Sequence, residues 1–154
     1  MEIGIISDTH GLVRPEVYDA FEGVDLIFHA GDIGSRDVII ELEALAPVKA
    51  VAGNVDLELA GRYPEQETFE LADRIVHLQH VFRDLPPEAP AGEERIRTLV
   101  VFGHSHRPLC RQVGDTLYFN PGSAGPRRFK LPVTVGRLTL ENDGARGRIL
   151  SLVS

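Results

Sequence analysis

The chain of 154 residues contains no tryptophan, one methionine and one cysteine, and only 6% of its residues are aromatic. A lone cysteine, Cys110, excludes an internal disulfide and favours a reducing compartment. No apolar run approaches the roughly 20 residues that a membrane-spanning helix needs. The first residues carry no basic leader or cleavage signal. These absences predict a cytoplasmic protein with no membrane partner, and Cys110, in an expected strand without a base beside it, is predicted to lie in the core.

Basic residues are scarce in the first two thirds of the chain. Residues 1–95 carry 20 acidic and 7 basic side chains, residues 96–154 carry 3 and 9, and the net charge is −7. Because proteins bind duplex nucleic acid through a dense face of Lys and Arg, this balance argues against such a partner. The basic C-terminal third presents either an ordinary solvated face or a surface for a small anion. Length, together with the absence of repeats and linkers, predicts one domain over residues 1–154.

Short β-branched runs alternate with helical patterns in the first half of the chain, which is typical of buried strands in an α/β protein. Helices are expected over residues 13–22 and over 35–46, where Ser35 is the predicted N-cap. Residues 83–94 form a turn-rich loop, with a short helix as an option at Glu93–Arg97. The expected strands are Ile3–Ile6, Leu26–Phe28, Val48–Ala52, Thr68–Leu71, Arg74–His80 (with its apolar run at Ile75–Leu78), Leu99–Phe102, Leu109–Val113, Leu117–Phe119, Val133–Leu140 and Gly147–Val153. Early helices and late strands favour two packed sheets with helices outside.

Polar residues able to bind metal follow five of these strands. Ligands of α/β sheets bind in the crevice beyond the carboxyl ends of the strands, so we expect these side chains to meet there. A sheet does not need ligating side chains at each of these strand ends to be stable, and the pattern therefore predicts a site. The seven candidate ligands are Asp8, His10, Asp32, Asn54, His80, His104 and His106.

Each motif taken alone has a simpler interpretation. Asp8 or Thr9 can cap a helix, and both Gly31-Asp32 and Gly53-Asn54 are common as plain turns. The paired histidines of His104-Ser105-His106, at the end of a strand, are the strongest single element, because a turn there can direct one imidazole to each of two metals.

The two remaining histidines are not expected to be ligands. His77 lies three residues before His80, so alternation along the strand places it on the opposite face, where it packs or meets solvent. His29 precedes Asp32 by three residues and is interpreted either as a group that orients a ligand or loop, or as a hydrogen-bonded core histidine.

Two carboxylates, an amide and three or four imidazoles are enough for two adjacent ions that share Asp32. Two cations roughly 3.5–4 Å apart lower the pKa of a bridging water from 15.7 toward about 7 and clamp the oxygens of a phosphoryl group. Hydrolysis of a phosphate ester, which is slow without catalysis, requires such activation.

The order of these motifs resembles that of the calcineurin-like metallophosphoesterases. Five motifs agree over nearly the whole chain, and with Asn120-Pro121-Gly122-Ser123 they are most similar to small phosphodiesterases of the YfcE type. The motifs are Asp8-Thr9-His10, Gly31-Asp32, Gly53-Asn54-Val55-Asp56, His80 and Gly103-His104-Ser105-His106. The resemblance implies an α/β fold, a four-layer sandwich of two mixed β-sheets flanked by helices.

The resemblance also implies the metal ligands and the ions. One metal takes Asp8, His10, Asp32 and His106, and the other takes Asp32, Asn54, His80 and His104. The ions implied are two divalent transition metals, Mn first, with Fe, Ni or Zn as alternatives.

The sequence departs from the family in two places. Larger relatives carry a histidine after the Asn, where this chain has Val55, which implies a substrate with a good leaving group or a slow enzyme. Small relatives carry a second histidine after the position of His80, where this chain has Val81 and Phe82. The helix that precedes the Gly-His motif in relatives also looks shortened here into the Pro-rich loop.

The leading hypothesis is therefore a dinuclear metal-dependent phosphodiesterase, in which a metal-bridging hydroxide attacks a small phosphate ester. Asp32, Asn54 and His104 are its candidate catalytic residues, and Arg127 or Arg128 is a candidate contact for the substrate phosphate. One alternative is a binding scaffold of the same fold, like the retromer subunit with its degraded metal site. A phosphomonoesterase or nuclease is another, and homo-oligomerisation is left open.

Overall fold

The computed structural model describes residues 1–59, 61–90 and 94–153, which form ten strands and two helices. The helices are α1 (Glu16–Ala20) and α2 (Arg36–Glu43). The strands are β1 (Glu2–Ile6), β2 (Leu26–His29), β3 (Val48–Ala50), β4 (Gln66–Leu71), β5 (Arg74–Gln79), β6 (Thr98–Val101), β7 (Leu109–Val113), β8 (Thr116–Asn120), β9 (Thr134–Glu141) and β10 (Gly144–Ser151).

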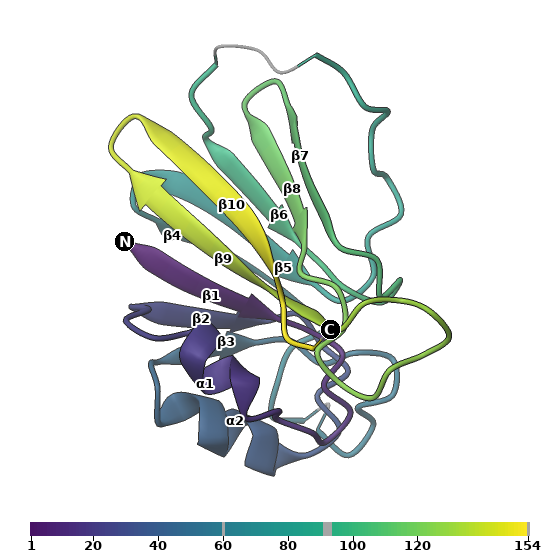
Figure 1. Cartoon of the computed structure of the whole chain (residues 1–154). Coiled ribbons are helices and arrows are strands. Elements are labelled where there is room, and N and C mark those ends of the chain that lie inside the picture. Colours follow the sequence, from purple (N-terminus) through teal and green to yellow (C-terminus); the bar gives the residue numbers. More distant parts are fainter. Residues whose placement is uncertain (60, 91–93, 154) are drawn as a thin grey trace.

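The strands form two mixed sheets, as predicted, and each sheet has five strands (Figure 1). The first sheet has the order β10-β9-β1-β2-β3, in which β1, β2 and β3 are parallel and the β9–β10 hairpin is antiparallel to β1. The second has the order β4-β5-β6-β8-β7, with β5, β6 and β8 parallel. Ligands of such sheets bind beyond the carboxyl ends of the parallel strands, so a site is expected there in both sheets.

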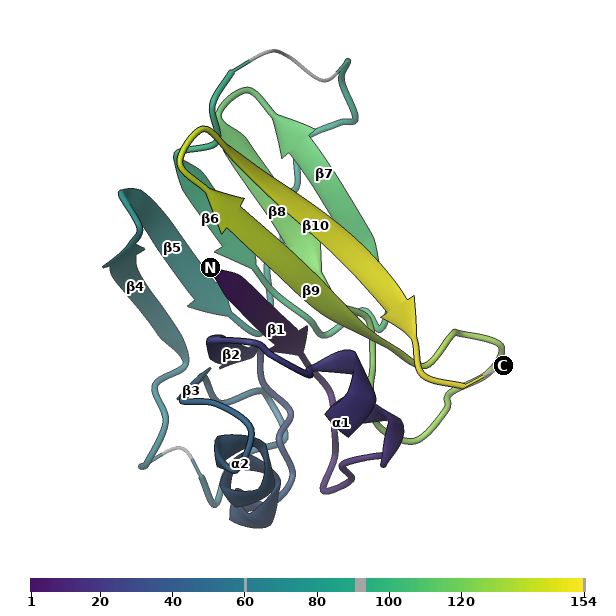
Figure 2. The same ribbon diagram turned by 60° about the vertical axis from the view of Figure 1, so that its left-hand side comes forward.

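The two sheets pack face to face over a continuous apolar core (Figure 2). Ile3, Ile5 and Phe28 of the first sheet meet Leu99 and Phe119 of the second. The Phe119 ring lies so close to the β9–β10 hairpin that a side chain at either of two glycines there would collide with it. The absence of side chains at these glycines, positions 136 and 147, lets the Phe119 ring of the second sheet pack directly against the first sheet.

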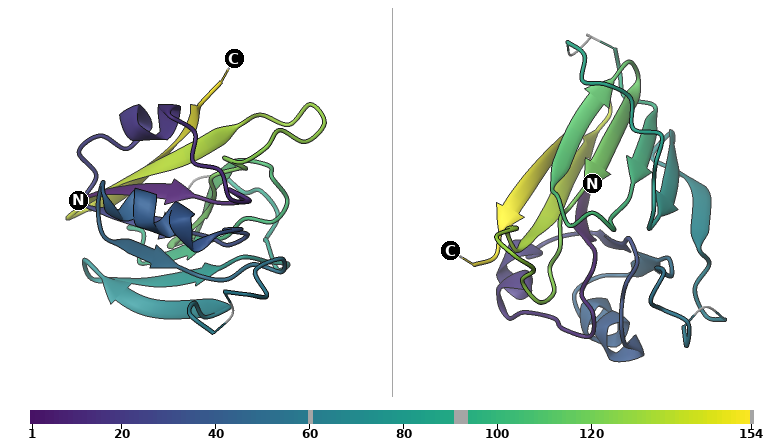
Figure 3. Two further views of the ribbon diagram at one scale, coloured as in Figure 1. Left: turned by 90° about the horizontal axis from the view of Figure 1, so that it is seen from below. Right: turned by 90° about the vertical axis from the view of Figure 1, so that its right-hand side faces the viewer.

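Both helices cover the outer face of the first sheet, as the two views of Figure 3 show. Val17 of α1, Phe21 at its C-cap and Leu42 of α2 are buried against Ile6 and Ile27. The predicted N-cap of α2 is confirmed, since the Ser35 hydroxyl accepts a hydrogen bond from the backbone N–H of residue 37. Neither helix has the length and apolar character required to cross a membrane.

The outer face of the second sheet carries no helix among the described residues. Phe82, at the start of the Pro-rich loop, packs against Phe102 and Tyr118 instead. Arg111 of β7 donates a hydrogen bond to the Pro86 carbonyl, which fixes the loop to the sheet. The sandwich is therefore flanked by helices on one side and by this loop on the other.

Local predictions differ from the structure in several places, among them the end of the second helix, which is at Glu43 rather than at residue 46. The first helix is shorter than residues 13–22, because the segment before Glu16 forms part of the loop that leaves β1. Of the optional helix at 93–97, residues 94–97 are irregular and residue 93 lies outside the described residues. Cys110 is exposed rather than buried, because β7 is an edge strand of the second sheet.

Candidate metal centre

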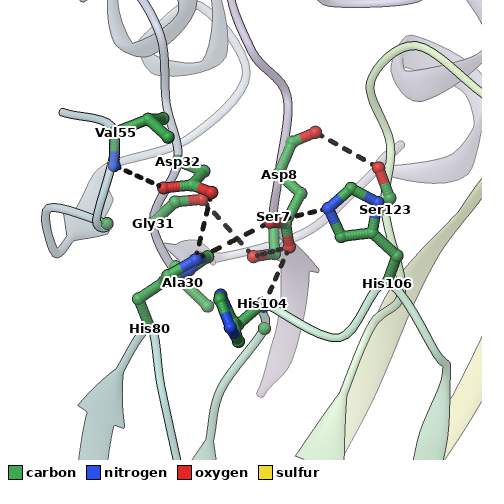
Figure 4. A network of polar contacts seen from close by, with 12 residues as sticks. Ser7, Asp8, Ala30, Gly31, Asp32, Val55, His80, His104, His106 and Ser123 are labelled. Carbon is green, nitrogen blue, oxygen red and sulfur yellow. Dashed lines mark hydrogen bonds and ion pairs between the residues drawn. The ribbon is translucent and has the colours of Figure 1, made fainter. Parts of the chain in front are cut away.

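The loops that leave the parallel strands of both sheets bring five predicted ligands into contact. Figure 4 shows four of them, Asp8, Asp32, His80 and His106. Asp8 and His10 follow β1, Asp32 follows β2, His80 follows β5 and His106 follows β6. Their side-chain donor atoms form two overlapping groups in which all atoms lie within 4.8 Å of one another. One group is Asp8, His10 and His106, and the other is Asp8, Asp32 and His80.

Asp8 lies at the centre of both groups and is fully buried. Its Oδ1 atom is 3.2 Å from His106 Nε2 and 3.8 Å from His80 Nε2. Its Oδ2 atom accepts hydrogen bonds from the Ser7 hydroxyl, at 2.7 Å, and from the His104 backbone N–H, at 3.2 Å. One carboxylate oxygen is thus fixed by the protein while the other faces the imidazoles.

Asp32 is arranged in the same way. Its Oδ2 atom is 3.2 Å from His80 Nε2 and 3.7 Å from His10 Nε2. Its Oδ1 atom accepts a hydrogen bond from the backbone N–H of Val55, at 3.2 Å. The position at which the sequence departs from larger relatives therefore still contributes to the site, through its backbone rather than its side chain.

Three buried atoms at the point of convergence have no hydrogen-bond partner: Asp8 Oδ1, His10 Nε2 and His80 Nε2. A buried polar group without a partner is costly and rare in a folded protein. Carboxylate oxygens and imidazole nitrogens that share one small space are the donor set of transition-metal sites. The residues present therefore fit divalent metal ions.

His80 is held in the orientation that a ligand needs. Its Nδ1 atom lies 2.8 Å from the Ala30 carbonyl, which can only accept, so this nitrogen carries a proton. In the neutral ring, Nε2 then presents its lone pair to the two carboxylates. Burial lowers the pKa of His80, but the Asp32 carboxylate, 3.2 Å from its Nε2 atom, the charge of Asp8 and the Ala30 carbonyl outweigh this, so the pKa is raised overall.

Asp32 shows the complementary shift. Burial raises the pKa of this carboxyl group, but the nearby His80 ring and its charge, together with the Val55 N–H, outweigh burial and lower the pKa overall. Asp32 is therefore a carboxylate at neutral pH, in the form that binds cations.

The backbone at the site adopts a conformation that side chains rarely take. Eight non-glycine residues among those described have positive φ angles, and five of them are predicted ligands. Such strain persists only where the surrounding structure enforces it, and it gathers at functional sites. The five are Asp8 (φ 56°), His10 (47°), Asp32 (53°), His104 (72°) and His106 (63°).

Two glycines allow these loops to approach one another. A side chain at Gly53 would collide with Asp32, and one at Gly103 would collide with Ser7 and Asp8. Both glycines come directly before predicted ligands, Asn54 and His104. The Gly-Asn and Gly-His pairs of the sequence are therefore required for close packing of loops and not for turns alone.

Asp56 fixes the geometry of the loops after β2 and β3. Its buried carboxylate accepts three backbone hydrogen bonds, from Ile33 at 2.9 Å, Gly34 at 2.9 Å and Gly53 at 2.8 Å. Asp56 belongs to one of the sequence motifs, but the sequence alone did not predict that it holds these loops. The only available signal was an acidic residue two positions after a predicted ligand.

His29 belongs to the supporting structure and is not in the ligand groups. Its Nδ1 atom accepts from the Gly31 N–H and its Nε2 atom lies 2.9 Å from the Thr9 hydroxyl, which in turn donates to the Ile33 carbonyl. Complete burial lowers the pKa of His29 to about 4, so the ring is neutral. These contacts fit both interpretations from sequence, since the ring is buried and hydrogen-bonded and also joins the loops after β1 and β2.

Two other motif residues hold the loop of His104 and His106. The Asn120 side chain donates to the Gly103 carbonyl and to the Ser105 hydroxyl. Ser123 donates to the backbone carbonyl of Asp8. The segment after β8 thus joins the histidine loop to the loop after β1.

Asn54 and His104 lie at the edge of the site and are exposed. The His104 ring is 5.3 Å from the His80 ring, between centroids, but it belongs to neither ligand group. Asn54 and His80 line a cleft of about 380 Å³ together with Glu65, Gln79 and Val81. His77 lies apart, hydrogen-bonded to Thr68 on the exposed side of β5.

Comparison with known proteins identifies the family. The calcineurin-like phosphoesterase superfamily domain matches residues 1–143. A probable metallophosphoesterase of Methanothermobacter thermautotrophicus is 40% identical over 143 residues, which cover 86% of this chain and 82% of the relative. The phosphodiesterase YfcE of Escherichia coli is 28% identical over 168 residues, covering 93% of this chain and 89% of YfcE.

Solved structures give the same result for the fold. An archaeal phosphodiesterase is 27% identical, with a TM-score of 0.73 over 97% of this chain and 100% of the other. Vps29 of Chaetomium thermophilum has a TM-score of 0.72 over 97% of this chain and 94% of its own, but is 16% identical, so this likeness shows the fold alone.

Proposed function

The chain belongs to the calcineurin-like phosphoesterase superfamily, and from this membership we propose that it is a dinuclear metal-dependent phosphodiesterase acting on a small phosphate ester. One observation carries the proposal. Carboxylate and imidazole atoms from four separate loops converge, and three buried ones, Asp8 Oδ1, His10 Nε2 and His80 Nε2, lack hydrogen-bond partners. A degraded site would lack a ligand, whereas all seven candidate positions here carry a ligating residue.

We assign Asp8, His10, Asp32 and His106 to one ion and Asp32, Asn54, His80 and His104 to the other. The contacts of Asp32 support its shared role, since its Oδ2 atom lies within 3.7 Å of one histidine from each set. Mn is the ion we propose first, because carboxylate and amide oxygens favour it over softer metals.

Two divalent cations held by these residues would supply an activated water nucleophile and would neutralise charge on the phosphoryl oxygens. The residues of the chain orient the ester around them. His104 and Asn54 are exposed at the edge of the site, beside the cleft of about 380 Å³, where each can donate a hydrogen bond to a phosphoryl oxygen. Val55 offers no imidazole to protonate the leaving group, so esters with acidic leaving groups are the better substrates.

Arg127 and Arg128 are the proposed contacts for the phosphate of the substrate. Both are exposed in the loop that follows Ser123. The Arg127→Ala/Arg128→Ala double variant should raise KM for a diester with little change in kcat, since these cations lie outside the ligand set. An unchanged KM in the double variant excludes this role.

A binding scaffold is the alternative from another class. It is supported only by the likeness of fold to Vps29, at 16% identity. A phosphomonoesterase or nuclease stays within the same chemistry, and a panel of mono- and diesters separates them. A cytoplasmic location stays a prediction from the cysteine content.

Hydrolysis of bis-p-nitrophenyl phosphate by the Mn-loaded protein tests the proposal. The parent protein should hydrolyse the diester and lose this activity after chelation. The Asp32→Asn variant should be inactive, whereas Asp143→Asn, at the exposed turn between β9 and β10, should match the parent. If the loaded parent leaves the diester intact, the proposed function is wrong.

A further inference from the structure

Phe129 is the most exposed large apolar residue among those described, with 94% of its surface accessible to solvent. It lies in a loop, residues 124–131, that extends beyond the ends of the strands at the right of Figure 1. A single exposed apolar residue needs no explanation in general. Two further features of Phe129 make it unusual.

The first feature is its backbone. The Leu131 N–H donates to the Arg128 carbonyl, which closes a tight turn with Phe129 and Lys130 as its central residues. Phe129 has a φ angle of 53°, at a position where turns of this kind prefer Gly, Asn or Asp. A bulky residue with positive φ is a strained outlier. The ring neither fills the core nor suits the turn, so folding does not account for it.

The second feature is the charge around the ring. Arg127, Arg128 and Lys130 are its neighbours in sequence, and the loop contains no acidic residue although the chain as a whole is acidic. Phe129, Lys130 and Leu131 line a surface pocket together with Arg107. An aromatic face edged by cations matches a planar aromatic group that carries a nearby anion.

The loop that carries Phe129 is anchored beside the candidate metal centre. Arg107 directly follows His106, which contacts Asp8. At the other end of the loop, Ser123 donates to the Asp8 carbonyl, and Arg14 donates to the Gly125 carbonyl (Figure 4 shows the first contact). A substrate whose phosphate lies at the metal centre can therefore extend a substituent toward Phe129.

We infer that Phe129, with Arg107 and Lys130, forms a subsite for the nucleobase of a nucleotide phosphodiester. The inference deepens the proposed function and rests on it for the position of the phosphate. The base stacks on the Phe129 ring, and the two cations balance the charge of the diester between base and metal centre. Phe129 is thus a specificity residue and takes no part in the chemical step.

Two diesters with the same leaving group provide the test: thymidine 5′-(p-nitrophenyl phosphate) and methyl p-nitrophenyl phosphate. In Phe129→Ala, the ratio of kcat/KM for the thymidine ester over the methyl ester should fall roughly tenfold, the scale of one stacked base. Phe129→Tyr should keep the ratio. Tyr18→Ala, which removes an exposed aromatic from α1, is the matched control and should also keep it.

Phe129→Gly separates binding from stability. Glycine relieves the strain at positive φ, so Tm should stay or rise while the ratio falls as in Phe129→Ala. A drop in Tm means that the ring supports the fold, which contradicts the inference.

An unchanged ratio in Phe129→Ala overturns the subsite. If Phe129→Ala also dissociates a dimer of the parent protein, Phe129 is instead a contact between two copies of the chain. The affinity for thymidine 5′-monophosphate, measured by calorimetry on the parent and on Phe129→Ala, tests the subsite without requiring hydrolysis. If neither ester is hydrolysed, the proposed function fails, but weaker nucleotide binding by Phe129→Ala than by the parent still supports the subsite.

Discussion

The two ends of the sandwich differ in how far their buried polar groups are hydrogen-bonded. At the end where β5 and β10 begin, the Arg74 guanidinium is buried and donates to the carbonyls of Ala72, Glu141 and Gly144. It thereby joins a turn of the second sheet to the β9–β10 turn of the first. Of its nitrogen atoms, Nε alone has no partner.

At the other end, buried acceptors are left open. Asp8 Oδ1, His10 Nε2 and His80 Nε2 have no partner, and the backbone there holds five strained ligand residues. The comparison indicates that one end supplies stability and the other gives up stability for binding. Variants at the two ends should therefore have opposite effects on folding and activity.

The largest expected effect is on activity, at the open end. Asp8→Asn removes a buried charge while keeping its shape, and asparagine tolerates the positive φ of 56°. We expect kcat/KM for a diester to fall by about 10³-fold or more, because metal catalysis supplies several kcal/mol. In chelator, the unfolding free energy should stay the same or rise, because the amide NH₂ can take the unpartnered Oδ1 position while the amide oxygen keeps the hydrogen bonds from Ser7 and His104.

Urea unfolding and diester kinetics measure the two effects, with the exposed Asp143→Asn as the matched control. Loss of stability in Asp8→Asn under chelation would mean that the open end also holds the fold together.

The next effect is on stability, at the opposite end. Arg74→Met leaves three carbonyl oxygens without their charged donor, and we expect it to lower the unfolding free energy by about 3 kcal/mol. Activity per folded molecule should not change, because the residue is remote from the metal centre. Arg146→Met, which breaks an exposed ion pair with Glu141, should cost less than about 1 kcal/mol. Equal losses in both variants contradict the comparison.

Asp56 contributes to both stability and activity, so its substitution should lower each of them, by less than the variants above. The two carboxylate oxygens of Asp56 accept three backbone hydrogen bonds, and Asp56→Asn replaces one of these oxygens with an NH₂ group, which can only donate. We expect a loss of about 2 kcal/mol in stability and a fall in kcat/KM of about 10–100-fold, as for other residues that orient ligands. Metal titrations should show weaker binding, whereas the exposed neighbour variant Glu58→Gln should bind like the parent. Unchanged metal affinity in Asp56→Asn excludes the positioning role.

The smallest effect is a pH dependence from His29. Its pKa in the folded state is about 4, below the ordinary 6.5, so the unfolded chain binds more protons between these values. Its contribution to stability is therefore present above pH 6.5 and is lost as pH falls toward 4. Between pH 7 and 5 this loss should be about 1–2 kcal/mol.

Unfolding curves in chelator at several pH values measure this loss. His29→Gln should flatten the dependence and His77→Gln, on an exposed strand face, should not. A titration of His29 near pH 6.5 by NMR contradicts the assignment.

Much of the fold and most of the site follow from the sequence, because periodicity and strand ends are local signals. The run Ile3–Ile6 marks a strand, and Asp8 must lie near its carboxyl end whatever the neighbouring strands are. The family and the two mixed sheets are confirmed by the comparisons and the structure.

What the sequence did not show depends on contacts between distant segments. Cys110 looks like a core residue until the order of strands places β7 at an edge. The Val55 N–H bound to Asp32 is a backbone contact, which no side-chain pattern reports. The loop on the outer face of the second sheet is held by Phe82 and Arg111, whose partners lie far away in the chain.

The central claim is that the open end of the sandwich binds two divalent ions that share Asp32. Elemental analysis after chelation, reloading with Mn and removal of free metal tests it directly. We expect two ions for each parent chain and for each Asp143→Asn chain, with at least one ion lost in Asp32→Asn. A parent chain that retains no metal, or an Asp32→Asn chain that retains as much as the parent, contradicts it.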